Sequence, residues 1–242
     1  MNIARLQYRF MHRVARRPDS KFFSFIPSYF NLAEQRILLQ VSLQKLNSME
    51  GRLLRKRRKV FEASRVPVVA PVSIEDIFLP DEYYQFEEGH FDGVIKNYRE
   101  MHITSWPEAE VEGLSPILNR LKALYPSTDT QTHLLHLASD GEILPHVDNL
   151  SASGSWIMGV SLGAERILRL EQVASDSNHV DIFEMPLPSG SVYIQKDFLR
   201  YHHQHAILKS GLIDGRMIGG GQRLSILIRD RLPPEGSKIP DL

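Results

Sequence analysis

His146 and Asp148, within Ile143-Leu-Pro-His-Val-Asp148, are a histidine and a carboxylate two residues apart, a spacing suited to metal binding. The segment has the composition of a β-strand, so we expect both side chains to leave the same face. An imidazole and a carboxylate side by side supply two of the three protein ligands of a facial-triad iron site, whose other coordination positions stay open for substrate and oxygen. The chain must then supply one more histidine.

The His-x-Asp pattern occurs at three places, which are His90 to Asp92, His146 to Asp148 and His179 to Asp181. The pattern alone therefore does not select a site. Between His146 and the histidine cluster at 201–205 we predict four strands, enough to pass halfway round a jelly roll and return. Only about two predicted strands follow His179 before that cluster, and His90 precedes the β-rich region. The pair His146 and Asp148 is preferred for this reason.

The second histidine is expected in the segment Tyr201-His-His-Gln-His205. On a strand, His203 and His205 share one face and His202 takes the other. Spacing alone leaves both His203 and His205 open as the third ligand. A polar surface cluster that binds no metal is the alternative.

A strand with two arginines follows, Arg223-Leu-Ser-Ile-Leu-Ile-Arg229, and period two puts both arginines and Ser225 on one face. An arginine directed into a small barrel needs a carboxylate partner, because an unpaired buried charge is very costly. Since a guanidinium binds a carboxylate through two parallel hydrogen bonds, Arg223 and Arg229 are suited to the two ends of 2-oxoglutarate. The phenol of Tyr193 is a further donor. Surface arginines on an edge strand and a structural tyrosine are the alternatives.

The amino-acid composition excludes several kinds of site. The 242 residues are 42% hydrophobic, enough for a packed core, and they include no cysteine, which excludes disulfides, zinc ribbons and thiol nucleophiles. Any metal is therefore held by His, Asp or Glu. Twenty-nine basic and twenty-nine acidic residues give a formal net charge of zero, which argues against a broad cationic surface for duplex DNA. No apolar run reaches the roughly 18 residues of a membrane-spanning helix.

The elements that must position these residues are helices first and strands later. Asn31 is expected to cap a helix that runs to about Asn47, and a second helix is predicted from Ser115, with Pro116 at its first position, until Pro126. The basic cluster at 52–59 is expected to be a solvated helix face, and contact with phosphates is the alternative. Strands are predicted at 132–137, 141–147, 155–162, 166–171, 180–183, 191–195 and 223–229. The expected fold is α+β, mainly β, with a double-stranded β-helix (jelly-roll) core and N-terminal supporting helices.

The N-terminus has a separate character. Its first eighteen residues contain five arginines and no acid, with apolar residues on another face of a predicted helix. This composition is typical of a mitochondrial transit peptide, which we place at 1–20. A basic amphipathic helix on the protein surface is the alternative.

In combination the motifs resemble the AlkB family of iron(II)/2-oxoglutarate dioxygenases, and within it the mitochondrial branch. The likeness extends over residues 24–234. It is carried by Gly141 to Asp148, Gly159-Val-Ser-Leu162, Pro188-Ser-Gly-Ser-Val-Tyr-Ile194, Arg200-Tyr201, Ile228-Arg-Asp-Arg-Leu-Pro233 and, upstream, His90 to Ile95, Tyr98-Arg-Glu100 and Trp106. The residues around His205 resemble the end of the family strand that bears the third ligand, which favours His205 over His203.

The resemblance implies a role for each candidate residue. The ligands of Fe(II) would be His146, Asp148 and His205, with no catalytic side chain beyond them. The far carboxylate of 2-oxoglutarate would be contacted by Tyr193, Arg223 and Ser225, and the carboxylate nearer the metal by Arg229. A dioxygenase domain at 24–234 would follow the transit peptide, with a flexible tail at 235–242.

The implied function is that of an oxidoreductase that uses O₂ to hydroxylate, or oxidatively demethylate, a protein or a methylated RNA in the mitochondrial matrix, with a link to regulated necrosis and fatty-acid metabolism. A non-turnover 2-oxoglutarate-binding regulator that acts through protein partners is the alternative. A metal-binding β-protein without the cosubstrate is a third reading.

Two features depart from the family pattern. Many relatives carry an Asn-x-Tyr pair on the strand before His-x-Asp, whereas this chain has His133-Leu-Leu-His136-Leu. Relatives also carry longer nucleotide-recognition lids where this chain has a short hairpin around His90. Base flipping needs a pocket that grips an extruded base, so the short hairpin argues against it.

Overall fold

The computed structural model describes residues 17–64, 73–173 and 182–232. Most of the transit peptide expected at 1–20 lies outside the described residues, as do the tail expected at 235–242 and the His-x-Asp pattern at 179–181. Among the helices of the described ranges, none is long and apolar enough to cross a membrane.

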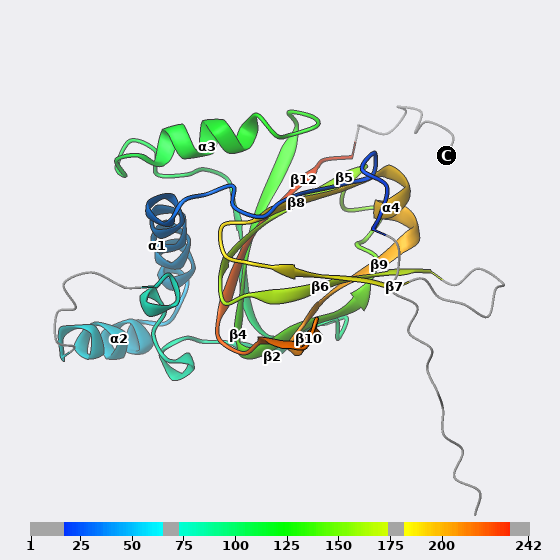
Figure 1. Ribbon diagram of the computed structural model, residues 1–242. Helices are drawn as coiled ribbons and strands as arrows, with labels where there is room; N and C mark the ends of the chain where they lie inside the picture. Colours follow the sequence, from blue (N-terminus) through cyan, green and yellow to red (C-terminus); the bar gives the residue numbers. More distant parts are fainter. Residues whose placement is uncertain (1–16, 65–72, 174–181, 233–242) are drawn as a thin grey trace, which may run out of the picture.

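The described strands form a curled antiparallel sheet of ten strands and a separate hairpin (Figure 1). One half of the sheet contains β1 (Phe23–Ile26), β8 (Val192–Lys196), β5 (Trp156–Gly163), β12 (Arg223–Asp230), the first part of β4 (Thr130–His146), β3 (Ile95–Ile103) and β2 (Glu87–Gly89). The other half contains the end of β4, β9 (His203–Leu208), β6 (Arg166–Gln172) and β7 (Ile182–Leu187). The hairpin is β10 (Ser210–Ile213) and β11 (Arg216–Gly219).

The two halves face each other because the long strand β4 takes part in both. Its first part pairs with β12 and β3, and its last residues pair with β9. An apolar cluster fills the interior between the halves and includes Leu135 from β4, Leu168 from β6, Tyr193 from β8 and Ile207 from β9. The expected double-stranded β-helix is confirmed.

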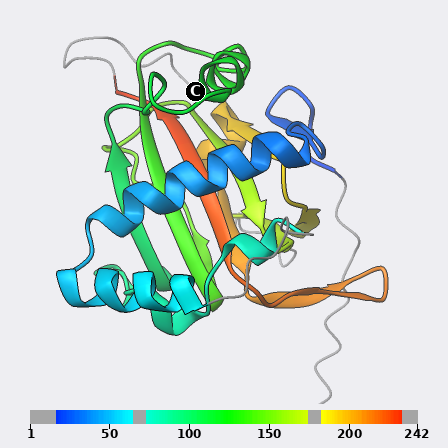
Figure 2. The same ribbon diagram turned by 90° about the vertical axis from the view of Figure 1, so that its left-hand side faces the viewer.

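Helices cover the outer face of the first half, as the supporting role predicted (Figure 2). They are α1 (Leu32–Ser48), α2 (Arg52–Ser64), α3 (Leu114–Lys122) and the short turns η1 (Glu75–Ile77) and η2 (Asp81–Tyr83). A second apolar cluster joins α1 and α3 to the outward side chains of β4, β5 and β12. A further short helix, α4 (Asp197–His202), connects β8 to β9. The interior between the two halves is thus lined mainly by side chains from strands, with Leu199 of α4 among them.

The first predicted helix is confirmed at its start and ends one residue beyond Asn47. The Asn31 side chain accepts a hydrogen bond from the Glu34 amide at 3.0 Å, and the Glu34 carboxylate accepts one from the Asn31 amide at 2.9 Å, a capping box. Glu34 also pairs with Arg120 of α3 at 2.6 and 2.7 Å. These contacts tie α1 to α3.

The predicted start of the second helix was wrong. The helix begins at Leu114 after Gly113, whose φ of 80° belongs to the left-handed region, and Pro116 is its third residue. Leu114 is fully buried, so its packing favours a helix that begins one residue earlier than predicted. Pro116 is tolerated as the third residue because the amides of the first turn have no hydrogen-bond partner within the helix.

The two strands predicted at 132–137 and 141–147 are one strand, β4. Gly141 lies in a bulge of β4, where residues 138–141 stand opposite the single residue Asn97 of β3, whose φ is 49°. A Cβ at Gly141 would lie 2.5 Å from the Asn97 carbonyl oxygen, so the strands meet this closely only with glycine. The predicted break was therefore a bulge, which bends β4 toward β9. Strands β1, β10 and β11 were not predicted, whereas β2, β3 and β9 were expected only as the hairpin around His90 and as the strand that bears His205.

Candidate metal centre and cosubstrate pocket

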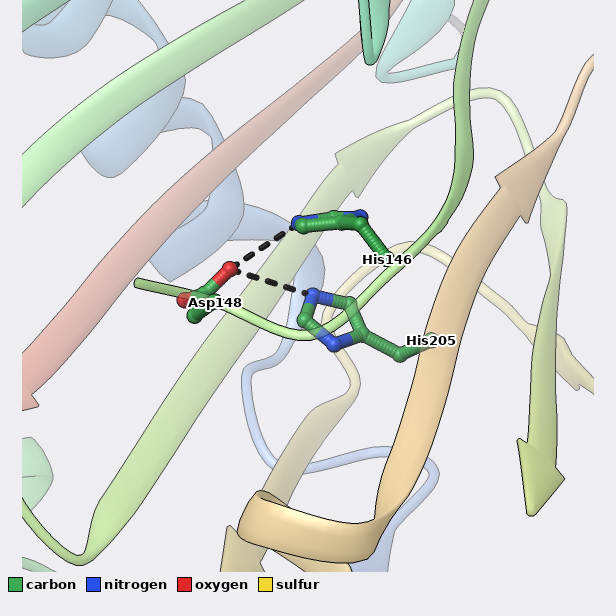
Figure 3. A group of neighbouring side chains, drawn as sticks. All are labelled: His146, Asp148 and His205. Carbon is green, nitrogen blue, oxygen red and sulfur yellow. Dashed lines mark hydrogen bonds and ion pairs between the residues drawn. The ribbon is translucent and has the colours of Figure 1, made fainter. Parts of the chain in front are cut away.

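The described residues contain one group of His, Cys, Asp or Glu able to hold a metal, and it consists of His146, Asp148 and His205 (Figure 3). One ligand atom from each lies within 4.8 Å of the others. His146 ends β4 and is the register partner of His205 on β9, so strand pairing brings together two histidines 59 positions apart (205 − 146). His146 Nε2 lies 2.9 Å from Asp148 Oδ1, and His205 Nε2 lies 3.6 Å from the same oxygen.

The expectation that Asp148 shares a strand face with His146 was wrong, because β4 ends at His146. The carboxylate instead turns back from the loop that follows (Figure 3). Arg200, a buried residue of α4, holds this loop by donating to the carbonyl oxygens of Asp148 at 3.2 Å and Asn149 at 3.4 Å and to Ser153 Oγ at 2.9 Å. Arg200 belongs to a motif that resembles the family, but its sequence context does not predict this positioning role.

The other histidines of the 201–205 segment lie outside the group. His202 ends α4 and is exposed, and His203 pairs in register with Gln172 on β6. In His146 the other ring nitrogen, Nδ1, lies 2.9 Å from the Leu144 carbonyl oxygen. A hydrogen bond donated there leaves Nε2 as the nitrogen that faces Asp148 and a metal. The choice of His205 over His203 agrees with this geometry.

The protonation states of the group suit a cation. Burial by itself would raise the pKa of Asp148, but the hydrogen-bonding contact with the His146 ring and the positive charge of Arg229 hold that pKa well below its ordinary value. Burial lowers the pKa of His205 to about 3, and the neighbouring His146 adds to the effect. At neutral pH the site therefore offers a carboxylate and a neutral imidazole, the forms that bind metals.

A pocket extends from the two histidines into the space between the two halves of the sheet, and about 410 Å³ of space free of protein atoms, part of it open to solvent, lies within it. Its polar lining is His146, His205, Tyr193, Arg223, Ser225 and Arg229. Its apolar lining includes Leu135, Ile143, Ile157 and Ile207. Every cosubstrate residue expected from the sequence thus reaches one pocket together with two of the expected metal ligands.

Arg223 is a buried cation without a carboxylate partner among the described residues, since its side chain is 1% exposed and forms no ion pair there. Its Nε donates to Ser161 Oγ at 2.9 Å, its Nη1 donates to Ser225 Oγ, and its Nη2 is buried with no partner. Burial lowers the pKa of Arg223 to about 10. An anionic ligand in the pocket would supply the missing acceptor, so these residues fit a dicarboxylate.

Ser161 of β5 also belongs to this pocket region and was missed as a site residue. It is fully buried and its hydroxyl accepts from Arg223 Nε at 2.9 Å. The signal was present in the sequence, because Ser161 lies in the Gly159-Val-Ser-Leu motif. The arginine is thus oriented by serines from two neighbouring strands, and its Nη2 is left for a ligand.

Arg229 differs from the expectation in its main contact. Its Nη2 lies 2.8 Å from Asp148 Oδ2, so it pairs with the candidate metal ligand itself. Its Nε is buried and has no partner in the described part of the chain. Arg229 therefore orients the Asp148 carboxylate from the pocket side while Arg200 holds the backbone behind it.

Tyr193 is buried, and its ring fills the space that a glycine leaves on the adjacent strand. A Cβ at Gly159, its register partner on β5, would lie 2.4 Å from the Tyr193 ring. Burial raises the pKa of the Tyr193 phenol, which therefore stays a protonated donor at neutral pH. This packing explains why a small residue stands at Gly159.

The segment His133-Leu-Leu-His136 of β4, where the sequence departs from the family pattern, gives the pocket an apolar side. Leu135 lines the pocket, whereas His136 lies on the opposite face of β4, accepts a hydrogen bond from Arg99 Nε at 2.9 Å and lies 3.0 Å from Gln222 Oε1. The inward side chain of this strand that lines the pocket is therefore a leucine. The short segment around His90 joins β2 to β3 as the predicted hairpin.

Comparison with known proteins agrees with this geometry. The model of the 2OG-Fe(II) oxygenase superfamily matches residues 23–229. The bovine (Bos taurus) protein "Alpha-ketoglutarate-dependent dioxygenase alkB homolog 7, mitochondrial" is 31% identical over 158 residues, 63% of this chain and 67% of the relative. The mouse (Mus musculus) protein of the same name is 29% identical with the same coverage. The solved structure of OsALKBH1 aligns with a TM-score of 0.48 at 14% identity, over 86% of this chain and 97% of that one.

The family match covers most of the chain, and the mammalian relatives are dioxygenases of the AlkB type. The cofactors of this superfamily, Fe(II) and 2-oxoglutarate, are the ones expected from the sequence, and O₂ is its oxidant. The chain therefore belongs to the 2OG-Fe(II) oxygenase superfamily and is an AlkB-family iron(II)- and 2-oxoglutarate-dependent dioxygenase.

Proposed function

We propose that His146, Asp148 and His205 bind the iron and that the adjoining pocket binds 2-oxoglutarate. The observation that carries the proposal is the convergence of the three ligand atoms within 4.8 Å beside the buried, unpaired Arg223. Bound iron with 2-oxoglutarate and O₂ supplies the oxidant that hydroxylates a substrate C–H bond while 2-oxoglutarate becomes succinate and CO₂. The protein orients the ligands and keeps the remaining coordination positions open.

Each pocket residue has a distinct role in this proposal. Arg223 binds the far carboxylate of 2-oxoglutarate, with Ser225 and the Tyr193 phenol as additional hydrogen-bonding groups. Arg229 holds Asp148 in place and approaches the end of 2-oxoglutarate nearer the metal. Leu135 packs against the carbon chain between the two carboxylates.

The substrate is proposed to be a protein or a methylated RNA, not duplex DNA. The formal net charge of zero and the short hairpin around His90 support this choice. Hydroxylation of an N-methyl group would release formaldehyde and leave the demethylated product. Mass spectrometry of proteins and mitochondrial RNA from cells that lack the gene tests the proposal, because the substrate should accumulate unmodified or still methylated.

The proposed location is the mitochondrial matrix. The arginines of residues 1–20 and the names of the mammalian relatives support it. Residues 1–25 fused to a fluorescent reporter should direct it to mitochondria, and a diffuse cytosolic signal would refute the transit peptide. The link to regulated necrosis and fatty-acid metabolism remains a prediction of the resemblance, which the same cells test through the extent of regulated necrosis and through fatty-acid oxidation rates.

Turnover without substrate tests the site directly. Iron-dependent formation of succinate from 2-oxoglutarate should be abolished by His146→Ala and retained by the control His202→Ala, at an exposed position on α4. Binding of 2-oxoglutarate without any turnover, including in the presence of protein and RNA extracts, would instead indicate the regulator that acts through protein partners.

A further inference from the structure

Helix α2 presents an unusual surface, because it buries an arginine and exposes its aliphatic side chains. Arg58 is 5% exposed, whereas Leu53 is 84% and Val60 is 62% exposed. Arg58 anchors the helix through an ion pair with Glu50 and through hydrogen bonds to the Tyr83 carbonyl oxygen at 3.1 and 2.8 Å. The side of α2 that faces solvent is thus left with apolar groups that a stable surface would normally bury.

The exposed side of α2 also carries a concentrated positive charge. Five of its cations are exposed, and they are Arg52, Arg55, Lys56, Arg57 and Lys59. None of them forms an ion pair with another of the described residues, and the helix holds a single acid, Glu62. The chain as a whole has a formal net charge of zero, so this cluster is a local feature of one helix.

The apolar and cationic groups share one face. With 3.6 residues per turn, Leu53 and Val60 lie on one stripe, and Lys56 and Arg57 flank it. These four side chains, with Phe61, line a shallow groove on the surface of the helix. In both views α2 lies at the outer edge of the molecule, and in Figure 1 it lies on the opposite side from β9, which carries His205.

We propose that α2 binds the surface of a membrane that contains anionic lipids. Exposed aliphatic side chains between lysines and arginines match the two parts of such a surface, since the aliphatic groups enter the headgroup boundary while the cations contact phosphates. Single-stranded RNA fits less well. It would leave Leu53 and Val60 exposed, and the aromatic rings available for base stacking, Phe61 and Tyr83, are already stacked on each other at 4.0 Å.

The test is sedimentation of the full chain with vesicles of phosphatidylcholine, with and without phosphatidylglycerol. The variant Arg52→Gln/Lys56→Gln/Arg57→Gln removes the cations nearest the aliphatic stripe and should lower partitioning onto the anionic vesicles roughly fivefold for each removed charge, about 100-fold in all. Leu53→Ser/Val60→Ser should lower binding at high salt, where charge attraction is screened. The matched control Lys122→Gln/Lys209→Gln removes exposed cations from other surfaces and should bind as the wild type does.

All variants keep residues 1–20, so any contribution of the N-terminal arginines is the same in each. None of the substituted residues lines the pocket of the metal centre, so iron-dependent succinate formation should be unchanged and shows that each variant is folded. Equal vesicle binding by the triple-glutamine variant and the wild type would overturn the proposal. The proposal would also be overturned if the protein bound an oligouridylate RNA more tightly than the anionic vesicles and if Leu53→Ser/Val60→Ser left that RNA binding unchanged. RNA would then be the ligand of α2.

Discussion

Replacement of Arg223 by methionine separates binding of 2-oxoglutarate from folding of the pocket. The arginine is 1% exposed, its Nε and Nη1 are held by serines, and its Nη2 has no partner in the described structure. Methionine occupies a similar volume without a charge, so the substitution removes both the bond to a bound carboxylate and the cost of an unpaired buried cation.

The substitution should weaken binding of 2-oxoglutarate but should not lower the stability of the protein without it, and the two quantities can be measured separately. Loss of a buried charged bond to a carboxylate costs about 2–5 kcal/mol, which raises the Kd for 2-oxoglutarate roughly 30- to 4,000-fold. The free energy of unfolding without 2-oxoglutarate should be equal to or greater than that of the wild type, because an unpaired buried charge is no longer present.

Calorimetric titration of the iron-free protein with 2-oxoglutarate and urea unfolding with and without 2-oxoglutarate provide the assay. Arg216→Met, at an exposed arginine that pairs with Glu165, is the control and should leave the Kd unchanged. An unchanged Kd in Arg223→Met would refute the assignment of the far carboxylate to this residue. A large loss of stability without the cosubstrate would show that Arg223 is already satisfied by the protein.

Three further predictions concern the parts that position the site. Gly159→Ala places a Cβ 2.4 Å from the Tyr193 ring and should lower the free energy of unfolding by about 1–3 kcal/mol in urea, whereas Gly51→Ala, with open space around it, should not. Arg200→Ala releases the loop that carries Asp148 and should weaken iron binding about 10- to 100-fold in a competitive chelator titration, and an unchanged affinity would remove the positioning role. Stability should fall as the pH drops below about 6.5, because burial lowers the pKa of His133 to about 3 in the folded protein while the unfolded chain takes up a proton near its ordinary value of 6.5. Urea unfolding of metal-free protein, prepared with a chelator, between about pH 7 and about pH 5 measures how the free energy of unfolding changes with pH. This dependence should be weaker in His133→Asn. An equal dependence in the variant would assign the loss of stability to other groups.

Local patterns in the sequence were sufficient wherever the physical cause is itself local. The capping box of Asn31 and Glu34 starts α1 where predicted, because its partners are three residues apart. Period two places Arg223, Ser225 and Arg229 together in the pocket, because a strand alternates its side chains whatever it pairs with. Four strands, as predicted, lie between His146 and the 201–205 segment in the described part of that interval, and they are β5, β6, β7 and β8.

Only the tertiary structure decided which of these residues meet. The pairing of β4 with β9 sets His205 opposite His146, and the bulge in β4 at Gly141 turns the strand toward β9. The contacts of Arg200 and Arg229 with the Asp148 segment likewise join elements far apart in the chain. The physical reason is that strand register and loop anchoring depend on partners distant in sequence. The two-residue period of a strand therefore predicts which of its side chains point inward, whereas the folded sheet decides which inward side chains from different strands lie close enough to share a metal or a cosubstrate.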